Sequence, residues 1–262
     1  MAIALVALAA LAFSTAGSAA DQSSGSDSPA CNRLQQKLER QRSGLRRAGN
    51  QTRRAAIRRN IGVTRRLRRL ACHPQPRPRL PRDFRGSGRY LVPDLGVNVP
   101  FTWTGSDGNS QMIAGGENYP IYFMNLIYGG SLYTITYRWP GVTIHPCSRI
   151  PGFSLDQLNQ IFATAAYVGP EILNRHRLRY VNHFRLATAF PPGAPSGLFP
   201  RIPFAEADIY VDERNPGTIW RILHFGFQNI YDPNLDEWIN MHTFKHTPGG
   251  VTLPPTCQPP AS

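Results

Sequence analysis

The chain lacks the short sequence motifs that identify many catalytic sites. It contains no GxSxG, no HExxH and no glycine-rich phosphate loop, so the usual patterns of serine hydrolases, zinc proteases and nucleotide-binding enzymes are missing. It also has no CxxC pair, and its cysteine spacing does not resemble a zinc site. We therefore predict no metal and no cofactor, and motifs alone leave open whether the protein is an enzyme.

The chain also lacks an apolar run of the roughly 20 residues that a membrane-spanning helix needs. Its N-terminus carries a shorter run, AIALVALAALAF at residues 2–13, followed by the small residues GSAA at 17–20. A short apolar core before such a site is typical of a cleaved secretory signal, although no Lys or Arg precedes it here. We predict a signal peptide over residues 1–20 and a secreted or cell-envelope location.

Cysteine is scarce, with only four residues: Cys31, Cys72, Cys147 and Cys257. An even number in an exported protein indicates two disulfides, which could pair in three ways, and free buried thiols are the alternative. We predict a Cys31–Cys72 bridge from the helical geometry described below. The Cys147–Cys257 bridge then follows by elimination.

The segment between the first two cysteines lacks Phe, Tyr and Trp and contains one acidic residue, Glu39. Lys37 and thirteen arginines bring its charge to +13, whereas residues 83–262 hold twelve basic and thirteen acidic residues. The arginines are Arg33, Arg40, Arg42, Arg46, Arg47, Arg53, Arg54, Arg58, Arg59, Arg65, Arg66, Arg68 and Arg69. This asymmetry indicates a partner for the segment rather than a property of the fold.

Leucine and isoleucine recur at helical spacing in this segment, and Gly49 and Asn50 interrupt the pattern. Thr52 could then cap a second helix. One continuous helix would hold Cys31 and Cys72 roughly 60 Å apart, at about 1.5 Å per residue. A hairpin bent at Gly49 instead brings them within the roughly 7 Å between Cα atoms that a disulfide requires. We therefore predict a helical hairpin over residues 31–72.

The remaining chain divides by composition. Residues 21–30, DQSSGSDSPA, are typical of a flexible linker, and residues 73–83 of an extended proline-rich spacer. We place the domain boundary at the spacer and assign residues 84–262 to a β-rich globular domain. The predicted fold class is α+β, with an N-terminal basic α-helical hairpin followed by a body of antiparallel strands and one main helix.

Within the body, aromatic and β-branched runs at 119–126 and 132–139 flank Tyr128-Gly129-Gly130-Ser131, which predicts a β-hairpin. The sequence SLDQLNQIFATAAYV at 154–168 predicts the main helix, with Ser154 as its N-cap. Further strands are predicted at 178–190, 205–212, 218–231 and 237–246.

Five-residue loops at 213–217 and 232–236 predict that residues of equal parity share a face in the C-terminal strands. Glu206 then lies opposite His224, and Asn240 opposite Gln228. The odd face would be the core: Ala207, Ile209, Val211, Ile219, Leu223, Phe225, Phe227, Ile239 and Met241. The even face would carry Glu206, Asp208, Tyr210, Asp212, Trp220, Ile222, His224, Gln228, Trp238, Asn240, His242, Phe244 and His246.

Three interpretations of this even face remain open from the sequence. The face could simply be solvated, as the polar side of an antiparallel sheet often is. It could bind a saccharide, because Trp220 and Trp238 offer flat apolar rings and Asn240 and His242 offer hydrogen bonds to hydroxyl groups. It could also be catalytic.

In the catalytic interpretation, Glu206 and Asp208 would act as acid and base in glycoside cleavage, with His224 close to Glu206. A metal site is disfavoured, because His242 and His246 would stand roughly 13 Å apart on a strand. A single-residue error in either loop would scatter all of these groups, since a register slip moves side chains to the other face.

The basic segment points to electrostatic binding of a polyanion, since the arginine guanidinium pairs bidentately with phosphate. A solvated basic surface with no dedicated ligand is the alternative. The principal candidates for polyanion binding are Arg46, Arg47, Arg53, Arg54, Arg58, Arg59, Arg65, Arg66, Arg68 and Arg69. Because aromatic residues are missing, we expect neither membrane insertion nor sequence-specific reading of nucleic acid.

Together, these features predict an exported non-enzymatic binding protein. Its hairpin would engage an anionic envelope polymer, an anionic membrane surface or extracellular nucleic acid, and its body could bind a saccharide. The first alternative is a secreted hydrolase acting on a polysaccharide through the even face. A structural protein of the envelope is the second.

Overall fold

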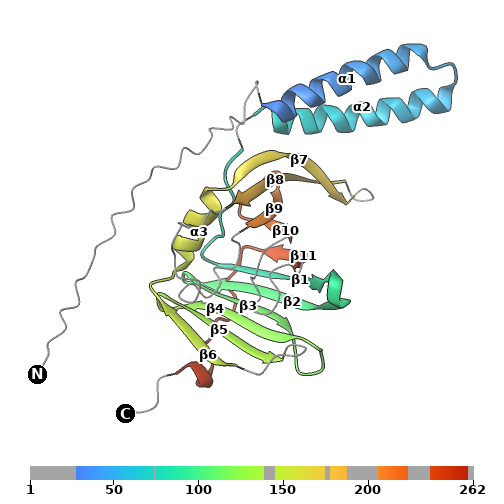
Figure 1. The fold of residues 1–262 in the computed structure, drawn as a ribbon. Coiled ribbons are helices and arrows are strands. Elements are labelled where there is room, and N and C mark those ends of the chain that lie inside the picture. Colours follow the sequence, from blue (N-terminus) through green and yellow to red (C-terminus); the bar gives the residue numbers. More distant parts are fainter. Residues whose placement is uncertain are drawn as a thin grey trace, which may run out of the picture.

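Figure 1 shows the computed structural model of the chain, in which a pair of N-terminal helices lies at one end of a large antiparallel sheet. The predicted α+β class is confirmed. The structure describes residues 28–73, 75–138, 145–174, 178–187, 206–223 and 237–258. The predicted signal peptide and most of the predicted linker lie outside these ranges. The helices are α1 (Pro29–Arg47), α2 (Gln51–Ala71) and α3 (Leu155–Ala163).

Helices α1 and α2 form the predicted basic hairpin and run antiparallel to each other (Figure 1). Ser28 caps α1, since its hydroxyl oxygen accepts a hydrogen bond from the backbone N–H of Cys31 at 3.1 Å. Asn50 caps α2 in the same way, accepting from Arg53 at 2.7 Å. The predicted cap, Thr52, instead lies within the first turn of α2, because Asn50 already satisfies the amide there.

The two hairpin helices bury few side chains against each other. Leu38 of α1 and Ile61 and Thr64 of α2 are buried along the seam. The Cys31–Cys72 bridge is confirmed and closes the open end of the hairpin, with the two Cα atoms 4.9 Å apart. A covalent staple is what an element with so small a core needs, because its own packing supplies little stability.

The described residues of the proline-rich segment after the hairpin form neither helix nor strand up to β1, and they pack against the body. Leu80 is buried in the main core. Its backbone N–H donates to the Asn159 side chain of α3 at 2.7 Å, and its carbonyl accepts from the same side chain at 3.0 Å. The backbone N–H of Arg79 donates to the Pro216 carbonyl. The segment is therefore held along the body over several residues.

Eleven strands form the sheet, in the order β6-β5-β4-β3-β2-β1-β11-β10-β9-β8-β7, and each neighbouring pair is antiparallel. Strands β1 and β11 therefore meet near its middle. The predicted hairpin after Tyr128 is confirmed as the β4–β5 turn. The strands are β1 (Phe84–Val92), β2 (Val97–Ser106), β3 (Asn109–Gly115), β4 (Tyr122–Tyr128), β5 (Ser131–Arg138), β6 (His145–Pro151), β7 (Ala166–Asn174), β8 (Arg179–Ala187), β9 (Glu206–Asp212), β10 (Ile219–Leu223) and β11 (Trp238–Lys245).

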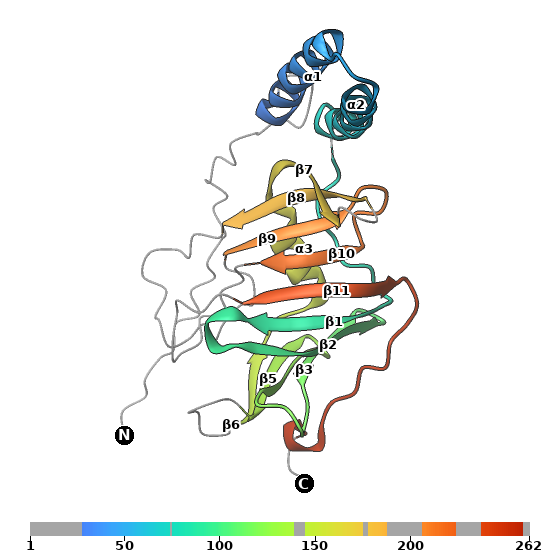
Figure 2. The same cartoon turned by 90° about the vertical axis from the view of Figure 1, so that its right-hand side faces the viewer.

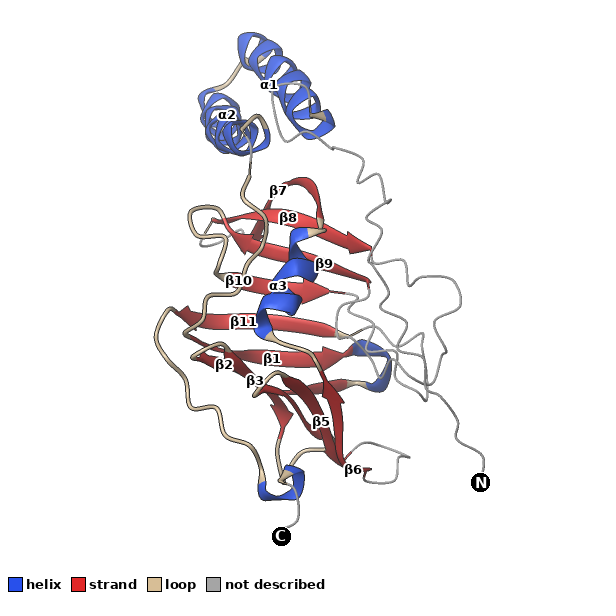
Figure 3. Cartoon of the chain, turned by 90° about the vertical axis from the view of Figure 1, so that its left-hand side faces the viewer, coloured by secondary structure: helices blue, strands red, loops and turns tan. Residues whose placement is uncertain are grey.

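Helix α3 covers one face of the sheet, and we call the opposite face the outer face (Figure 3). Leu158 and Phe162 of α3 are buried in the main core, and Ser154 forms a capping box with Gln157. The helix is shorter than predicted, because it ends at Ala163 and the chain continues directly into β7. Thr164 forms the C-cap, where its backbone N–H and its hydroxyl both donate to the Ile161 carbonyl.

The C-terminal tail runs from β11 beside the half of the sheet that holds β1–β6 and ends near β6 (Figure 2). Val251 and Leu253 pack against a second apolar cluster on β4 and β5, which includes Leu126 and Ile135. The Cys147–Cys257 bridge, also confirmed, fixes the end of the tail beside β6, with Cα atoms 5.2 Å apart. The outer face of β1 and β8–β11 carries polar and charged side chains instead.

The register of the C-terminal strands differs from the prediction. Asp208 pairs with Leu223 instead of Ile222, and Asn240 pairs with Arg221 instead of Gln228. The first difference comes from a bulge at Trp220, which has no partner residue on β9. The second arises because β10 pairs with β11 seven residues out of the predicted register. One extra residue in a strand moves every later side chain to the other face.

A second bulge lies at His242 of β11, because the residues on either side of it pair with Gly88 and Ser87 of β1. Beyond this bulge, Phe244 stacks on the buried Phe84 with ring centroids 5.5 Å apart. Phe244 is therefore on the core side and not on the predicted even face. The predicted core residues Ala207, Ile209, Val211, Ile219, Ile239 and Met241 are buried, with Ile222 taking the place of Leu223.

Candidate functional site

The arginines of the hairpin point mostly into solvent. Of the thirteen, twelve are exposed, and Lys37 is exposed as well. The single acidic residue, Glu39, hydrogen-bonds to the neutral side chain of Gln35 at 2.7 Å. Within the part of the chain that the structure describes, none of the twelve exposed arginines forms an ion pair. The surface of the hairpin is therefore a dense array of positive charges on two rigid helices.

The thirteenth arginine, Arg66, attaches the hairpin to the body. Its guanidinium pairs with the largely buried Glu213 carboxylate, with one hydrogen bond of 3.1 Å from Nε. The same group lies 4.2 Å above the ring of Tyr180 on β8. The hydrogen bond to Glu213 is the main cause that raises the pKa of Arg66. Arg66 is thus a docking contact, which sets it apart from the other predicted binding arginines.

On the body, three of the four predicted binding residues come together. Trp220, Asn240 and His242 line a cavity of about 320 Å³ on the outer face, between β1, β10, β11 and the β7–β8 end. Trp238 is not among the lining residues that the structure describes. It lies on β11 between Leu91 of β1 and Leu223 of β10, two residues before Asn240, whereas His242 lies two residues after Asn240.

The cavity also contains three arginines that sequence reasoning did not select: Arg89 of β1, Arg179 of β8 and Arg221 of β10. The guanidinium of Arg179 lies 3.7 Å above the Trp220 ring. Trp220 therefore carries a cation on one face, which limits its use as an open platform for a neutral sugar ring. Each of these arginines lies on a different strand, and the sequence does not show that the three strands bring them together. The observed strand order and registers do.

A charged network lies next to this cavity on the outer face. The ring of His183 is held between Glu171, 2.9 Å from Nδ1, and Asp208, 2.7 Å from Nε2, and it stacks on Tyr210. Arg185 donates two hydrogen bonds to Asp208, at 2.9 and 3.3 Å. Asp208 was a predicted site residue, whereas its two charged partners, His183 and Arg185, were not.

The two buried members of this network have shifted pKa values. Burial alone would lower the pKa of His183, but its hydrogen bonds with Glu171 and Asp208 raise it overall. Burial would raise the pKa of Asp208, but hydrogen bonds from Arg185 and His183 lower it overall. Both shifts favour the charged forms, so the network is a salt-bridged cluster whose polar atoms are occupied.

Of the predicted catalytic group, the structure describes the side chain of Asp208 alone. Asp208 is already engaged by two cationic side chains, and His224 lies outside the described residues. Glu206 begins β9 and pairs with Ala187 of β8 through the backbone. Since the predicted opposition of Glu206 and His224 rested on a β9–β10 register that the structure does not have, it is withdrawn. Among the described residues, no group of three His, Cys, Asp or Glu side chains is arranged so that it could hold a metal ion.

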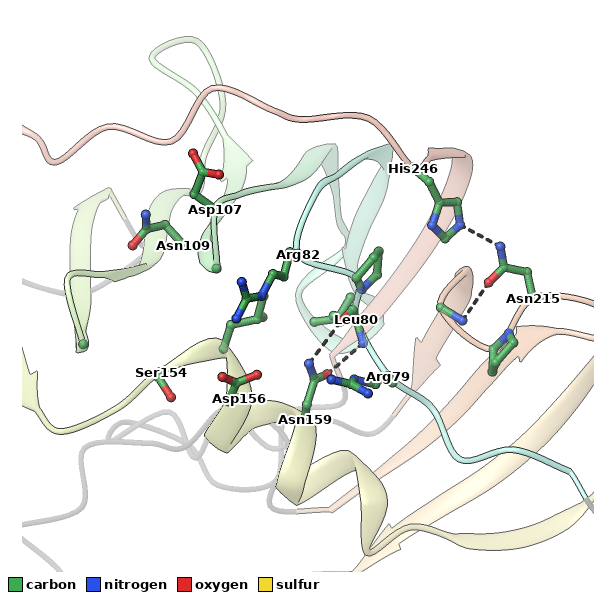
Figure 4. A pocket seen from close by; sticks show the side chains of 16 residues that line it. Arg79, Leu80, Arg82, Asp107, Asn109, Ser154, Asp156, Asn159, Asn215 and His246 are labelled. Carbon is green, nitrogen blue, oxygen red and sulfur yellow. Dashed lines mark hydrogen bonds between the residues drawn. The ribbon is translucent and has the colours of Figure 1, made fainter.

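A larger cavity, of about 540 Å³, lies on the α3 side, where the proline-rich segment crosses the body (Figure 4). His246 lines it and hydrogen-bonds to Asn215 at 3.0 Å and Thr218 at 2.8 Å. His246 is therefore on the opposite side of the sheet from the predicted even face. Arg79 and Arg82 share this cavity with two acidic residues, Asp107 and Asp156. Its mixed charge favours no particular ligand.

No protein-family model matches the chain, and no curated protein is significantly similar to it. Over the described part of the chain, none of the helices has both the length and the apolar character that crossing a membrane requires. The two disulfides indicate an oxidising environment.

Proposed function

We propose that the protein is an exported binding protein that attaches to a polyanionic polymer through its basic hairpin. One observation carries this proposal: twelve arginines and Lys37 are exposed on a disulfide-stapled hairpin whose described residues offer a single carboxylate to offset them. Like charges gathered on a rigid surface repel one another, which destabilises the free protein. A polyanion relieves this repulsion and releases its own counterions on binding.

The hairpin is suited to contact along a polymer. Each helix is about 30 Å long at about 1.5 Å per residue, so its guanidinium groups can reach several phosphates of an extended chain. The hairpin has no aromatic residues to insert into a bilayer or to stack on bases. We therefore favour an anionic polymer of the cell envelope over a membrane surface or a specific nucleic acid sequence.

Export is part of the proposal. The apolar run at residues 2–13 is typical of a secretory signal, and disulfides persist in oxidising compartments outside the cytoplasm. The body would then carry a second ligand, for which Trp220, Asn240 and His242 are the candidates that share a cavity. A hydrolase function has less support, because Asp208, one of its two predicted carboxylates, is held in two ion pairs.

The test compares two variants of equal net charge. Arg58→Gln/Arg59→Gln removes two exposed charges from the hairpin, and Arg82→Gln/Arg214→Gln removes two exposed charges from outside it. Binding to long-chain polyphosphate should weaken about tenfold or more in the first variant and change little in the second. Equal weakening in both would mean that only total charge matters, and the hairpin would lose its assigned role.

A panel of ligands distinguishes the possible partners. Polyphosphate, duplex DNA of two unrelated sequences and vesicles of anionic phospholipid are compared at equal phosphate concentration. If the proposal holds, the two DNA sequences bind with the same affinity. The hairpin binds the surface of the vesicles without inserting into the bilayer. Vesicle binding that far exceeds binding to both polymers would redirect the proposal to a membrane surface.

A further inference from the structure

We propose that the outer-face cavity binds a small molecule bearing an oxyanion group, held by Arg89, Arg179 and Arg221. The inference narrows the second ligand of the body suggested above and does not depend on the hairpin. It rests on the charge of the cavity, on the way its arginines are positioned and on the bulges that shape it.

The charge of the cavity is one-sided. Its described lining contains three guanidinium groups and His242, and no Asp or Glu. By contrast, the larger cavity beside α3 combines Arg79 and Arg82 with two carboxylates. Arg89 and Arg221 pair with no described carboxylate, so their guanidinium groups repel each other unless an anion lies between them. The arrangement therefore favours a ligand with a carboxylate, phosphate or sulfate group.

Two of these guanidinium groups are held by neutral partners. Arg89 donates from Nε to the Asn98 side chain at 2.7 Å and from Nη2 to the Asn98 carbonyl at 2.8 Å. Arg221 donates from Nε to the Asn240 side chain at 2.5 Å. Among the described residues, neither arginine pairs with a carboxylate, whereas Arg185 on the same face is paired with Asp208. Their positive charges are thus oriented without being neutralised.

The third guanidinium, that of Arg179, is oriented by stacking on Trp220. Trp220 is itself fixed, since its indole N–H donates to Asp212 at 3.1 Å. Arginines positioned in advance lose little side-chain entropy when a ligand binds, so more of the hydrogen-bond energy appears as affinity.

The two bulges lie at this cavity. Trp220 is the extra residue of β10, His242 is the extra residue of β11, and both line the cavity. A bulge interrupts the regular alternation of a strand and re-aims a side chain, at the cost of ladder hydrogen bonds, and bulges recur next to binding sites. Their coincidence here indicates that the sheet is locally shaped around this space.

Volume and polarity limit the ligand. A cavity of about 320 Å³ lies at the small end of ligand pockets, so it admits a small molecule or one unit of a polymer. Asn98, Asn174 and Asn240 supply amide groups that can hydrogen-bond to hydroxyls. A hydroxylated oxyanion, such as a sugar acid or a sugar phosphate, matches both features.

The test uses the full-length oxidised protein and titration calorimetry with galacturonate, galactose and inorganic phosphate. The inference expects galacturonate or phosphate to bind and galactose, which differs from galacturonate by lacking the carboxylate, to bind at least about tenfold more weakly. Galactose that binds as tightly as galacturonate would leave a saccharide site but overturn the oxyanion. Failure of all three to bind also overturns the inference.

Variants locate the site. Arg221→Gln and Arg89→Gln should each weaken binding of the bound anion about tenfold or more, and thermal unfolding shows whether each variant still folds. The matched control is Arg82→Gln, which removes the same charge from the other cavity and should leave binding unchanged. The Arg58→Gln/Arg59→Gln hairpin variant should also bind normally. Loss of anion binding in that variant instead would assign the anion to the hairpin and overturn the inference.

Discussion

The hairpin and the body carry their charges in opposite ways. The hairpin displays its cations on the surface, has a seam of a few buried residues and depends on one disulfide. The body is nearly neutral, buries a large apolar core, and pairs charged groups such as His183 and Asp208 with each other. Among the described residues, the body thus pairs some of its charged groups internally, whereas twelve arginines of the hairpin are exposed and have no carboxylate partner.

The largest expected loss of folding stability comes from a substitution in the core of the body. Trp103 is fully buried, packs edge-on against Phe84 at 5.6 Å and donates from its indole N–H to Ser110 at 2.8 Å. Trp103→Ala should lower the free energy of unfolding by about 3–5 kcal/mol, because it leaves a cavity and an unpaired hydroxyl. Denaturant unfolding measures the loss. Trp103→Phe, which keeps an aromatic ring there, should cost less.

The next effect concerns the staple of the hairpin. The Cys31–Cys72 bridge closes a loop with a sequence separation of 41 residues, worth about 4 kcal/mol in the chain-entropy model. Cys31→Ala/Cys72→Ala should therefore loosen the hairpin and leave the body folded. Limited trypsin digestion, read by mass spectrometry, should then cut first within residues 31–72. Simultaneous loss of the body would show that the two regions are one cooperative unit.

The charged network of the body predicts a pH dependence. The raised pKa of His183 means that protonation favours the folded state, so this contribution is complete below about pH 6.5 and fades as pH rises through the raised pKa. Asp208→Asn should lower the pKa of His183 and cost about 1.5–3 kcal/mol. NMR titration of the imidazole and unfolding at pH 6 and pH 9 measure both. Asp107→Asn, at an exposed turn, should change neither.

The lowered pKa of Asp208 affects the stability of the fold at acidic pH. Its ionised form is favoured by the fold, so this contribution is present above its ordinary pKa near 4 and is lost as pH falls through the depressed value. If the free energy of unfolding of Asp208→Asn fell below about pH 4 as steeply as that of the wild type, the role given to this carboxylate would be contradicted.

The smallest effect is expected where the two regions meet. Arg66→Gln should cost no more than about 1 kcal/mol, because the side chain of Arg66 is 41% exposed and its pairing with Glu213 is screened by water. A double-mutant cycle with Glu213→Gln isolates the pair. Arg65→Gln, at the exposed neighbouring position, should show no coupling to Glu213. A coupling of several kcal/mol would mean that the hairpin is an integral part of the body.

Sequence reasoning succeeded where a pattern is local. The hairpin followed from the break at Gly49 together with two cysteines at its ends, and the second disulfide followed from the first. The β4–β5 turn followed from its glycines, and Ser154 was correctly placed as a helix cap. In these cases neighbouring residues decide the outcome through dihedral preference, capping or chain closure.

Sequence reasoning failed where long-range pairing decides. Strand β2 alternates buried and exposed residues, yet the sheet around it could not be ordered from sequence. The bulges at Trp220 and His242 break the regular alternation of faces, and no local sequence pattern predicts them. The parity argument still brought Trp220, Asn240 and His242 to one face, but missed Arg89 and Arg179, because they come from strands whose neighbours were unknown.

The salt dependence of polyanion binding tests the central claim most directly. With duplex DNA as a calibrated polyanion, the logarithm of the binding constant should fall linearly with the logarithm of salt concentration, with a slope of about −4 or steeper. Arg58→Gln/Arg59→Gln should make that slope shallower by up to about two, while Arg82→Gln/Arg214→Gln should leave it unchanged. A slope near zero, or an equal change in both variants, would contradict the account of the hairpin as the polyanion-binding element.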